Sequence, residues 1–107
     1  MNLNSLSLAL RLSREAISQQ VRASQVEMLL IIADTPGLTQ KEIADRSDMT
    51  TSTVSRAVDV FSDSGRRDGK GGAAGLVEIR LDPDDERLKL VYLTEKGQAF
   101  LYQLQNL

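Results

Sequence analysis

Apolar residues near the start of the chain recur at the spacing of a helix. Over residues 3–22 they fall mainly at intervals of three, four or seven positions, so one helical face collects them. The set consists of Leu3, Leu6, Leu10, Ile17 and Val21, with Leu8 and Leu12 widening the face. We expect this helix to pack one side on the body of the protein and to offer the other to a second copy of the chain. Ordinary core packing is the alternative.

The next apolar stretch predicts a helix that is buried on several sides. It begins near Ser24 or Gln25 and continues to Ala33, with apolar residues almost all round. The sequence Thr35-Pro36-Gly37 then ends it. The residue before a proline avoids helical dihedral angles, and glycine accepts the positive φ of a tight turn.

Two short helices separated by a turn follow. Thr39 and Glu42 form a capping box, which predicts the start of a helix that stops around Ser47-Asp48. A second helix is capped by one of three hydroxyl residues at positions 50–52 and ends at Ser64-Gly65. Its apolar face, at i, i+3, i+4 and i+7, consists of Val54, Ala57, Val58 and Phe61. Two helices across a turn of about four residues are typical of a helix-turn-helix.

The exposed side of the second helix carries the candidate chemistry. Opposite its apolar face lie Ser52, Arg56, Asp59 and Asp63, with Thr53 and Ser55 on the flanks. Carboxylates in the second half repel phosphates, so only the amino-terminal half can approach DNA closely. The residues expected to contact DNA from this helix are Thr51, Ser52, Thr53, Ser55 and Arg56. Thr39 and Gln40 are expected to contact phosphates, and a solvated helix face is the alternative for all of them.

Residues 66–75 predict a flexible loop, because they contain four glycines and three cations. We expect Arg66, Arg67 and Lys70 to touch phosphates without reading sequence. A nucleotide-binding loop is not expected, since the glycine spacing fails and no Ser or Thr follows Lys70.

Alternating residues over 76–81 and 88–93 predict two short strands. The segment 82–87 between them contains Pro83 and four carboxylates, which suit a hairpin tip. A two-stranded ribbon after a helix-turn-helix is a wing. Thr94 then caps a last helix whose apolar stripe consists of Phe100, Leu101, Leu104 and Leu107.

Composition excludes most enzyme chemistry. The 107 residues contain no Cys and no His, which removes thiol nucleophiles, imidazole catalysis, disulfides and Cys/His zinc sites. The carboxylates of the wing tip lack the glycine and distal glutamate of a calcium loop, so we expect neither a metal nor a cofactor. No apolar stretch is long enough to cross a bilayer, and a cytoplasmic protein that is not an enzyme is the expectation.

Two blocks of the sequence resemble the MarR-type winged-helix transcriptional regulators of bacteria and archaea. The first is the helix-turn-helix, residues 38–44 and 52–59. The second is more specific and consists of Gly75-Leu76-Val77-Glu78, Arg80, residues 82–87 and the run from Val91 to Gly97. The resemblance implies a homodimer on a pseudo-palindromic operator, with the recognition helix in the major groove. It also implies that Arg87 reaches the minor groove, oriented by Asp82 or Asp85.

We therefore predict an α+β, mainly α fold, a winged helix-turn-helix with a two-stranded β wing and flanking N- and C-terminal helices. A single domain over 1–107 would comprise an N-terminal dimerisation helix (1–23), the winged helix-turn-helix (24–93) and a C-terminal helix (94–107). The predicted function is sequence-specific binding of double-stranded DNA as a transcriptional regulator, with a homodimer formed through the N- and C-terminal helices.

Two other functions are alternatives to a transcriptional regulator. The net charge of −2 and the acidic wing tip favour a winged-helix protein-interaction module, an antagonist or adaptor. A replication or recombination factor would share the DNA chemistry. No residue supports a small-molecule effector.

Overall fold

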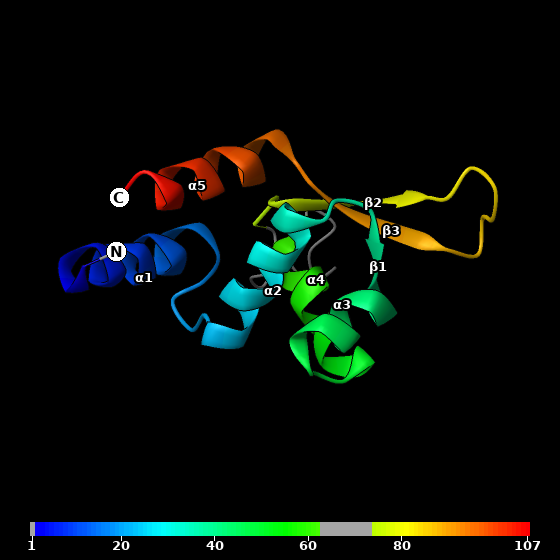
Figure 1. The fold of residues 1–107 in the computed structure, drawn as a ribbon, viewed down its shortest axis with the longest axis horizontal. Coiled ribbons are helices and arrows are strands. Elements are labelled where there is room, and N and C mark those ends of the chain that lie inside the picture. Colours follow the sequence, from blue (N-terminus) through cyan, green and yellow to red (C-terminus); the bar gives the residue numbers. More distant parts are fainter. Residues whose placement is uncertain (1, 63–73) are drawn as a thin grey trace.

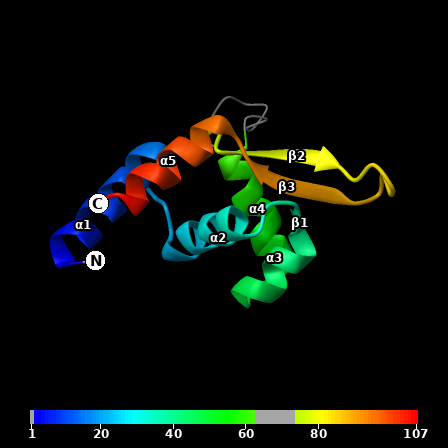
Figure 2. The ribbon, with the colours of Figure 1, turned by 45° about the horizontal axis from the view of Figure 1, so that its top comes forward.

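The computed structural model describes residues 2–62 and 74–107, which form five helices and three strands. In chain order they are α1 (Leu3–Ala16), α2 (Ala23–Asp34), β1 (Leu38–Thr39), α3 (Gln40–Ser47), α4 (Thr51–Phe61), β2 (Val77–Leu81), β3 (Lys89–Leu93) and α5 (Glu95–Gln105). Helices α1 and α5 lie at one end of the molecule, and the β2–β3 hairpin extends from the other (Figure 1). After a 45° rotation α1 and α5 are still side by side, with both chain ends near them (Figure 2).

The hairpin belongs to a three-stranded antiparallel sheet in the order β1-β3-β2. Val77 pairs with Leu93 and Leu81 pairs with Lys89, so the wing is in register along its whole length. Strand β1 adds Leu38 opposite Val91. The predicted wing is confirmed, and the structure adds β1, which the sequence analysis missed because two residues are too few for an alternating pattern.

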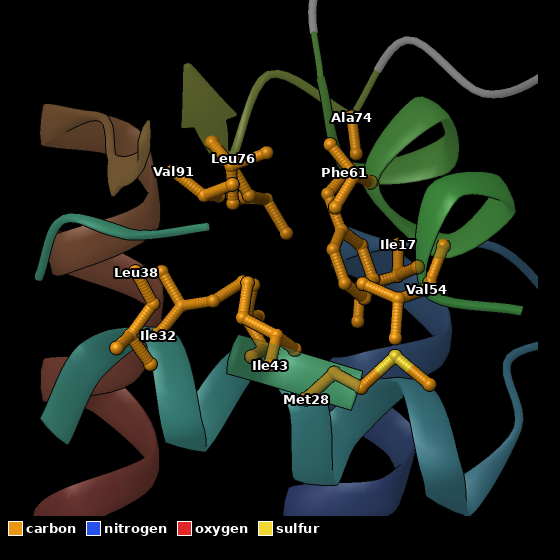
Figure 3. Close-up of a cluster of buried hydrophobic side chains, with 14 of the residues drawn as sticks. Ile17, Met28, Ile32, Leu38, Ile43, Val54, Phe61, Ala74, Leu76 and Val91 are labelled. Atoms are coloured by element: carbon orange, nitrogen blue, oxygen red, sulfur yellow. The ribbon is translucent and has the colours of Figure 1, made fainter. Parts of the chain in front are cut away.

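The hydrophobic core surrounds α4. The four residues of its predicted apolar face are at most 2% exposed, which confirms that this face points inward. Figure 3 shows Phe61 and Val54 facing the same interior as Leu76 from the start of the wing and Met28 from α2. Burying side chains of this size removes apolar surface from water and stabilises the fold by about 1.5–3 kcal/mol each. The core therefore fixes which side of α4 faces solvent.

Side-chain caps mark the beginnings of the helices in the winged part of the chain. The Glu42 N–H donates to Thr39 Oγ1 at 3.2 Å and the Thr39 N–H donates to Glu42 Oε1 at 3.1 Å, the predicted capping box. Thr50 caps α4 by accepting from the Thr53 N–H at 3.1 Å. These bonds satisfy backbone donors that the first turn of a helix leaves free.

The predicted single helix over residues 3–22 is wrong at its second half. Helix α1 ends at Ala16, and residues 17–22 form a turn in which the Val21 N–H donates to the Ser18 carbonyl at 3.1 Å. Ile17 is 8% exposed and belongs to the core, so the chain bends there to bury it and to start α2. No Gly or Pro marks this bend, and periodicity alone could not place it.

The predicted end of the recognition helix at Ser64-Gly65 is also wrong. Helix α4 ends at Phe61, because Ser62 adopts extended dihedral angles and forms a parallel bridge with Val77. The pairing of Ser62 with the wing ends the helix before the helical pattern of the sequence does. Residues 63–65, with the Asp63 of the predicted exposed face, lie outside the described residues.

Within 2–62 and 74–107, no helix is long and apolar enough to span a bilayer.

Replacing Phe61 with Ala should lower the free energy of unfolding by about 3–5 kcal/mol, because a fully buried aromatic ring leaves a cavity at the centre of the core. Urea denaturation followed by circular dichroism measures the loss. Leu81→Ala is the control: this wing side chain is 55% exposed and its truncation should cost less than about 1 kcal/mol. Equal losses in the two variants would contradict the assigned centre of the core.

Candidate nucleic-acid interface

An open hollow lies where the amino-terminal ends of α3 and α4 meet. Its lining is polar and consists of Gln40, Thr51, Ser52, Ser55 and Arg56. The α3–turn–α4 geometry creates it: Asp48 closes α3 in the left-handed conformation at φ 57°, and Thr50 restarts the chain as the cap of α4. Five of the residues predicted to contact DNA are thus brought together on one surface.

Arg56 provides the positive charge of this hollow. Its side chain is exposed, and it makes no hydrogen bond or ion pair with any residue of 2–62 or 74–107. Ser52 is exposed one turn before it, and Asp59 is exposed one turn after it. The charge on the outer face of α4 therefore changes from positive to negative along the helix, as the sequence predicted. A guanidinium without a protein partner keeps all of its donors for a ligand.

Thr53 differs from its neighbours because it is already engaged. Its hydroxyl lies 2.9 Å from the hydroxyl of Thr50, and it is only partly exposed. The contact stiffens the first turn of α4 and leaves Thr53 less hydrogen-bonding capacity than Ser52 or Ser55 has.

Thr39 is engaged in a similar way. Its hydroxyl accepts from the Glu42 N–H and lies 3.0 Å from Glu42 Oε1. Among the two residues predicted to contact phosphates, Gln40 lines the hollow and Thr39 primarily caps α3.

The wing tip holds a second exposed arginine in a fixed orientation. Arg87 donates from Nε to Asp85 Oδ1 at 3.0 Å and from Nη2 to Asp85 Oδ2 at 3.1 Å. The side chain of Arg87 is nevertheless 91% exposed. Asp82 has another role: its carboxylate accepts from the Asp84 N–H at 2.8 Å and shapes the turn. Of the two aspartates considered from the sequence, Asp85 holds the guanidinium.

Two carboxyl groups at this surface have lowered pKa values. The Arg87 guanidinium, followed by the Arg87 backbone N–H, lowers the pKa of Asp85, and the same pairing raises the pKa of Arg87. The Thr39 backbone N–H and then its hydroxyl lower the pKa of Glu42. A lowered folded-state pKa favours the ionised form, so each contribution to stability is present above the ordinary carboxyl pKa and is lost as the pH falls through the lowered value.

One wing interaction was missed from the sequence. Arg80 on β2 pairs with Glu78 of the same strand, and its guanidinium lies over the Tyr92 ring, 4.4 Å from the centroid. Glu78 is directly opposite Tyr92, which makes Arg80 the diagonal neighbour of the ring. Only the register of the hairpin reveals this cluster.

Three predicted contacts are not tested by the structure. Arg66, Arg67 and Lys70 lie outside the described residues. In the described part of the chain, no group of three or more His, Cys, Asp or Glu residues is placed to hold a metal ion.

A helix-turn-helix followed by an antiparallel wing defines a winged-helix protein. Residues 19–65 match the model of the MarR family. No curated protein matches the chain. The predicted resemblance to MarR-type winged-helix transcriptional regulators is confirmed by the family match together with the solved structures that share this fold.

Three of these structures illustrate the likeness. The regulator PcaV from Streptomyces coelicolor is 22% identical, with a TM-score of 0.66 over 96% of this chain and 68% of that protein. A MepR mutant from S. aureus bound to an oligodeoxyribonucleotide is 20% identical, with a TM-score of 0.72 over 96% and 67%. A MarR mutant from E. coli complexed with operator DNA is 25% identical, with a TM-score of 0.67 over 97% and 68%. The chain therefore spans about two thirds of the length of each.

Replacing Arg87 with Ala should raise the pKa of Asp85, because the cation that favours its ionised form is removed. The pH titration of side-chain carboxyl shifts by NMR measures it. Glu42 serves as the internal control: its pKa is held by Thr39, so it should titrate unchanged in the same spectra. An unchanged Asp85 titration would contradict the pairing at the wing tip.

Proposed function

We propose that this protein is a sequence-specific, double-stranded DNA-binding transcriptional regulator, with α4 in the major groove and the wing in the minor groove. The observation that carries the proposal is the polar hollow at the amino end of α4. It gathers an amide, three hydroxyls and the Arg56 guanidinium, which has no partner within 2–62 and 74–107. These are the groups that hydrogen-bond to base edges.

The chemistry of α4 favours entry by its amino-terminal half. Arg56 can form two hydrogen bonds to guanine O6 and N7, and the Ser52 and Ser55 hydroxyls can serve either as donors or as acceptors. Asp59 lies one turn further on and is exposed, so it would repel phosphates if the whole helix lay in the groove. The order of charges along α4 therefore supports a tilted helix whose amino-terminal half enters the major groove.

The wing is suited to a narrow, negatively charged groove. Asp85 holds the Arg87 guanidinium in one orientation before DNA binds, which reduces the entropy lost on insertion. The strongly negative potential of a narrow minor groove attracts such a cation. Because the groove potential, and not a base edge, attracts Arg87, we expect this residue to add affinity for any duplex more than discrimination between duplexes.

A homodimer through α1 and α5 is part of the proposal. The two helices contact each other at the end of the molecule opposite the wing. They expose Leu3 (84%), Leu6 (47%), Leu10 (46%) and Tyr102 (68%). Leu3, Leu6 and Leu10 share one face of α1 by their spacing, and an exposed apolar face favours burial against a second copy. Two recognition helices related by a two-fold axis would then read half-sites about one helical turn apart.

The acidic wing tip favours one other function, a protein-binding module. Asp84 and Glu86 are exposed beside Arg87. Salt dependence separates the two. Binding to DNA through several phosphate contacts weakens steeply as salt increases, whereas a mainly apolar protein contact does not.

Arg56→Ala and Arg87→Ala should have different effects on DNA binding. Binding sites are first selected from a random duplex pool, and affinities for the selected and a scrambled duplex are then measured at several salt concentrations. Arg56→Ala should lose about 1–3 kcal/mol of discrimination between the two duplexes. Arg87→Ala should weaken binding to both duplexes with less change in the discrimination between them. It should also reduce the slope of log affinity against log salt concentration by about 1.

Arg11→Ala is the matched control for these variants. It removes one exposed arginine from α1, at the far end from the wing, and should leave discrimination unchanged. Unchanged discrimination in Arg56→Ala would remove Arg56 from the reading surface. A random pool without any enriched sequence would contradict the proposed function.

Replacing both Leu6 and Leu10 with Ser should shift the protein toward monomer in sedimentation velocity, because exposed leucines of α1 would lose their apolar contact with a second copy. Leu81→Ser, an exposed leucine on the wing, is the control and should sediment like the parent. A double variant that sediments unchanged would contradict the α1 interface.

A further inference from the structure

The backbone of one residue connects the recognition helix to the helix that follows the wing. The Leu76 N–H donates to the Phe61 carbonyl at 2.7 Å, at the end of α4. The Leu76 carbonyl accepts from the Thr94 N–H at 3.0 Å, at the start of α5. The side chain of Leu76 is fully buried. The base of the wing is thus held from both sides.

The Thr94 hydroxyl makes a second connection at the same place. It donates to the Gly75 carbonyl at 2.6 Å and accepts from the Gly97 N–H at 3.0 Å. Gly75 has a φ of 69°, which a residue with a side chain adopts only with strain. One hydroxyl therefore joins the chain that enters β2 to the first turn of α5.

Gly97 allows these elements to approach so closely. A Cβ atom added to Gly97 would lie 2.1 Å from the Leu76 carbonyl oxygen and 3.2 Å from Leu93 Cδ2. The first neighbour is backbone that is itself hydrogen-bonded on both sides, so it cannot move without breaking those bonds. The absence of a side chain at Gly97 lets the first turn of α5 lie directly on the base of the wing.

We propose that Thr94 and Gly97 are positioning residues for DNA recognition. They form a joint, defined as Gly75, Leu76, Thr94 and Gly97, that fixes the wing relative to α4. The joint thereby determines where Arg87 enters the minor groove when Arg56 is bound in the major groove. This inference rests on the proposed DNA-binding function and names residues outside the predicted DNA contacts.

The length of the wing explains why such a joint matters. The five residues of β3 span roughly 17 Å at the rise of an extended strand, and Arg87 lies in the turn beyond them. A rotation of about 10° at the base would move the tip by roughly 3 Å, far more than a hydrogen bond tolerates. Strand β1 also holds the wing, but only on the β3 side, where Leu38 lies opposite Val91 and Thr39 opposite Leu90. The joint adds an anchor at the start of β2, the strand that β1 does not touch.

Thr94→Val and Thr94→Ser test the joint. Valine keeps the shape of the side chain and removes the hydroxyl, whereas serine keeps the hydroxyl and loses one methyl group. Each is combined with Arg87→Ala and, separately, with Arg56→Ala, and duplex affinities are measured at fixed salt. In the parent and in Thr94→Ser, removing Arg87 should weaken binding by the same factor. In Thr94→Val, removing Arg87 should weaken binding by a factor close to one. Removing Arg56 should still weaken binding as much as it does in the parent.

A purely structural role of Thr94 predicts a different result. General loss of stability would leave both factors unchanged or reduce them together, and either outcome overturns the proposal. Thr35→Val is the matched control, because the Thr35 hydroxyl accepts from Arg46 Nη1 at 2.7 Å, away from the joint. It should leave both factors as in the parent.

A distance measurement tests the joint without DNA. The chain contains no cysteine, so Asp59→Cys with Glu86→Cys places two spin labels, one on α4 and one at the wing tip. Labelled protein is diluted with unlabelled chain, and pulsed electron resonance measures the distribution of distances. The distribution should be equally narrow in the parent and in Thr94→Ser, and broadened or shifted in Thr94→Val. An unchanged distribution in Thr94→Val overturns the joint, whereas a parent that binds no duplex overturns only the DNA-binding function.

Discussion

Burial of the apolar face of α4 is the constraint on which the rest of the structure depends. The face is contacted by α2 and α3, and Leu76 at the start of the wing completes its surroundings. A helix packed along one whole side cannot rotate about its axis without exposing apolar surface. The outward direction of Ser52 and Arg56 is therefore a result of packing, and no contact of their own is needed to hold them there.

Charge is distributed so that a chain with net charge −2 can still present cations to an anionic partner. Arg56, near the middle of α4, has no partner within 2–62 and 74–107, and Ser52 lies in the first turn of the same helix, where the helix dipole favours anions. At the wing tip, Asp85 offsets Arg87 while holding it in place. The negative net charge and the pairing of Arg87 with Asp85 imply weak attachment to arbitrary DNA, because non-specific affinity depends mainly on the number of phosphates neutralised. Selectivity then depends on geometry more than on total charge.

The sequence predicted what local rules determine. The cap at Thr39, the apolar face of α4 and the alternating strands of the wing were found from spacing, whereas Thr50 was one of three candidate caps. The ends of α1 and α4 were not, because Ile17 turns inward and Ser62 pairs with Val77 through contacts between distant parts of the chain. In the candidate site, the residues lining the hollow followed from helical periodicity. The sequence could not show that Asp85, and not Asp82, holds Arg87, because this depends on the geometry of the turn. It could not show the joint at Leu76 either, because this depends on which backbone carbonyl each N–H reaches.

The short strand β1 has a consequence for how this molecule reaches its native state. Its pairing of Leu38 with Val91 encloses the whole helix-turn-helix within one long loop of chain, and Gly37 extends the ladder through its N–H, 3.0 Å from the Val91 carbonyl. Contacts that close such a loop form late, since the entropy of closure is lost before the bonds are gained. The helix-turn-helix therefore depends on β3 for its native packing. A peptide of α3 and α4 alone would lack this strand, and in a growing chain the two helices can pack against it only after β3 has been synthesised.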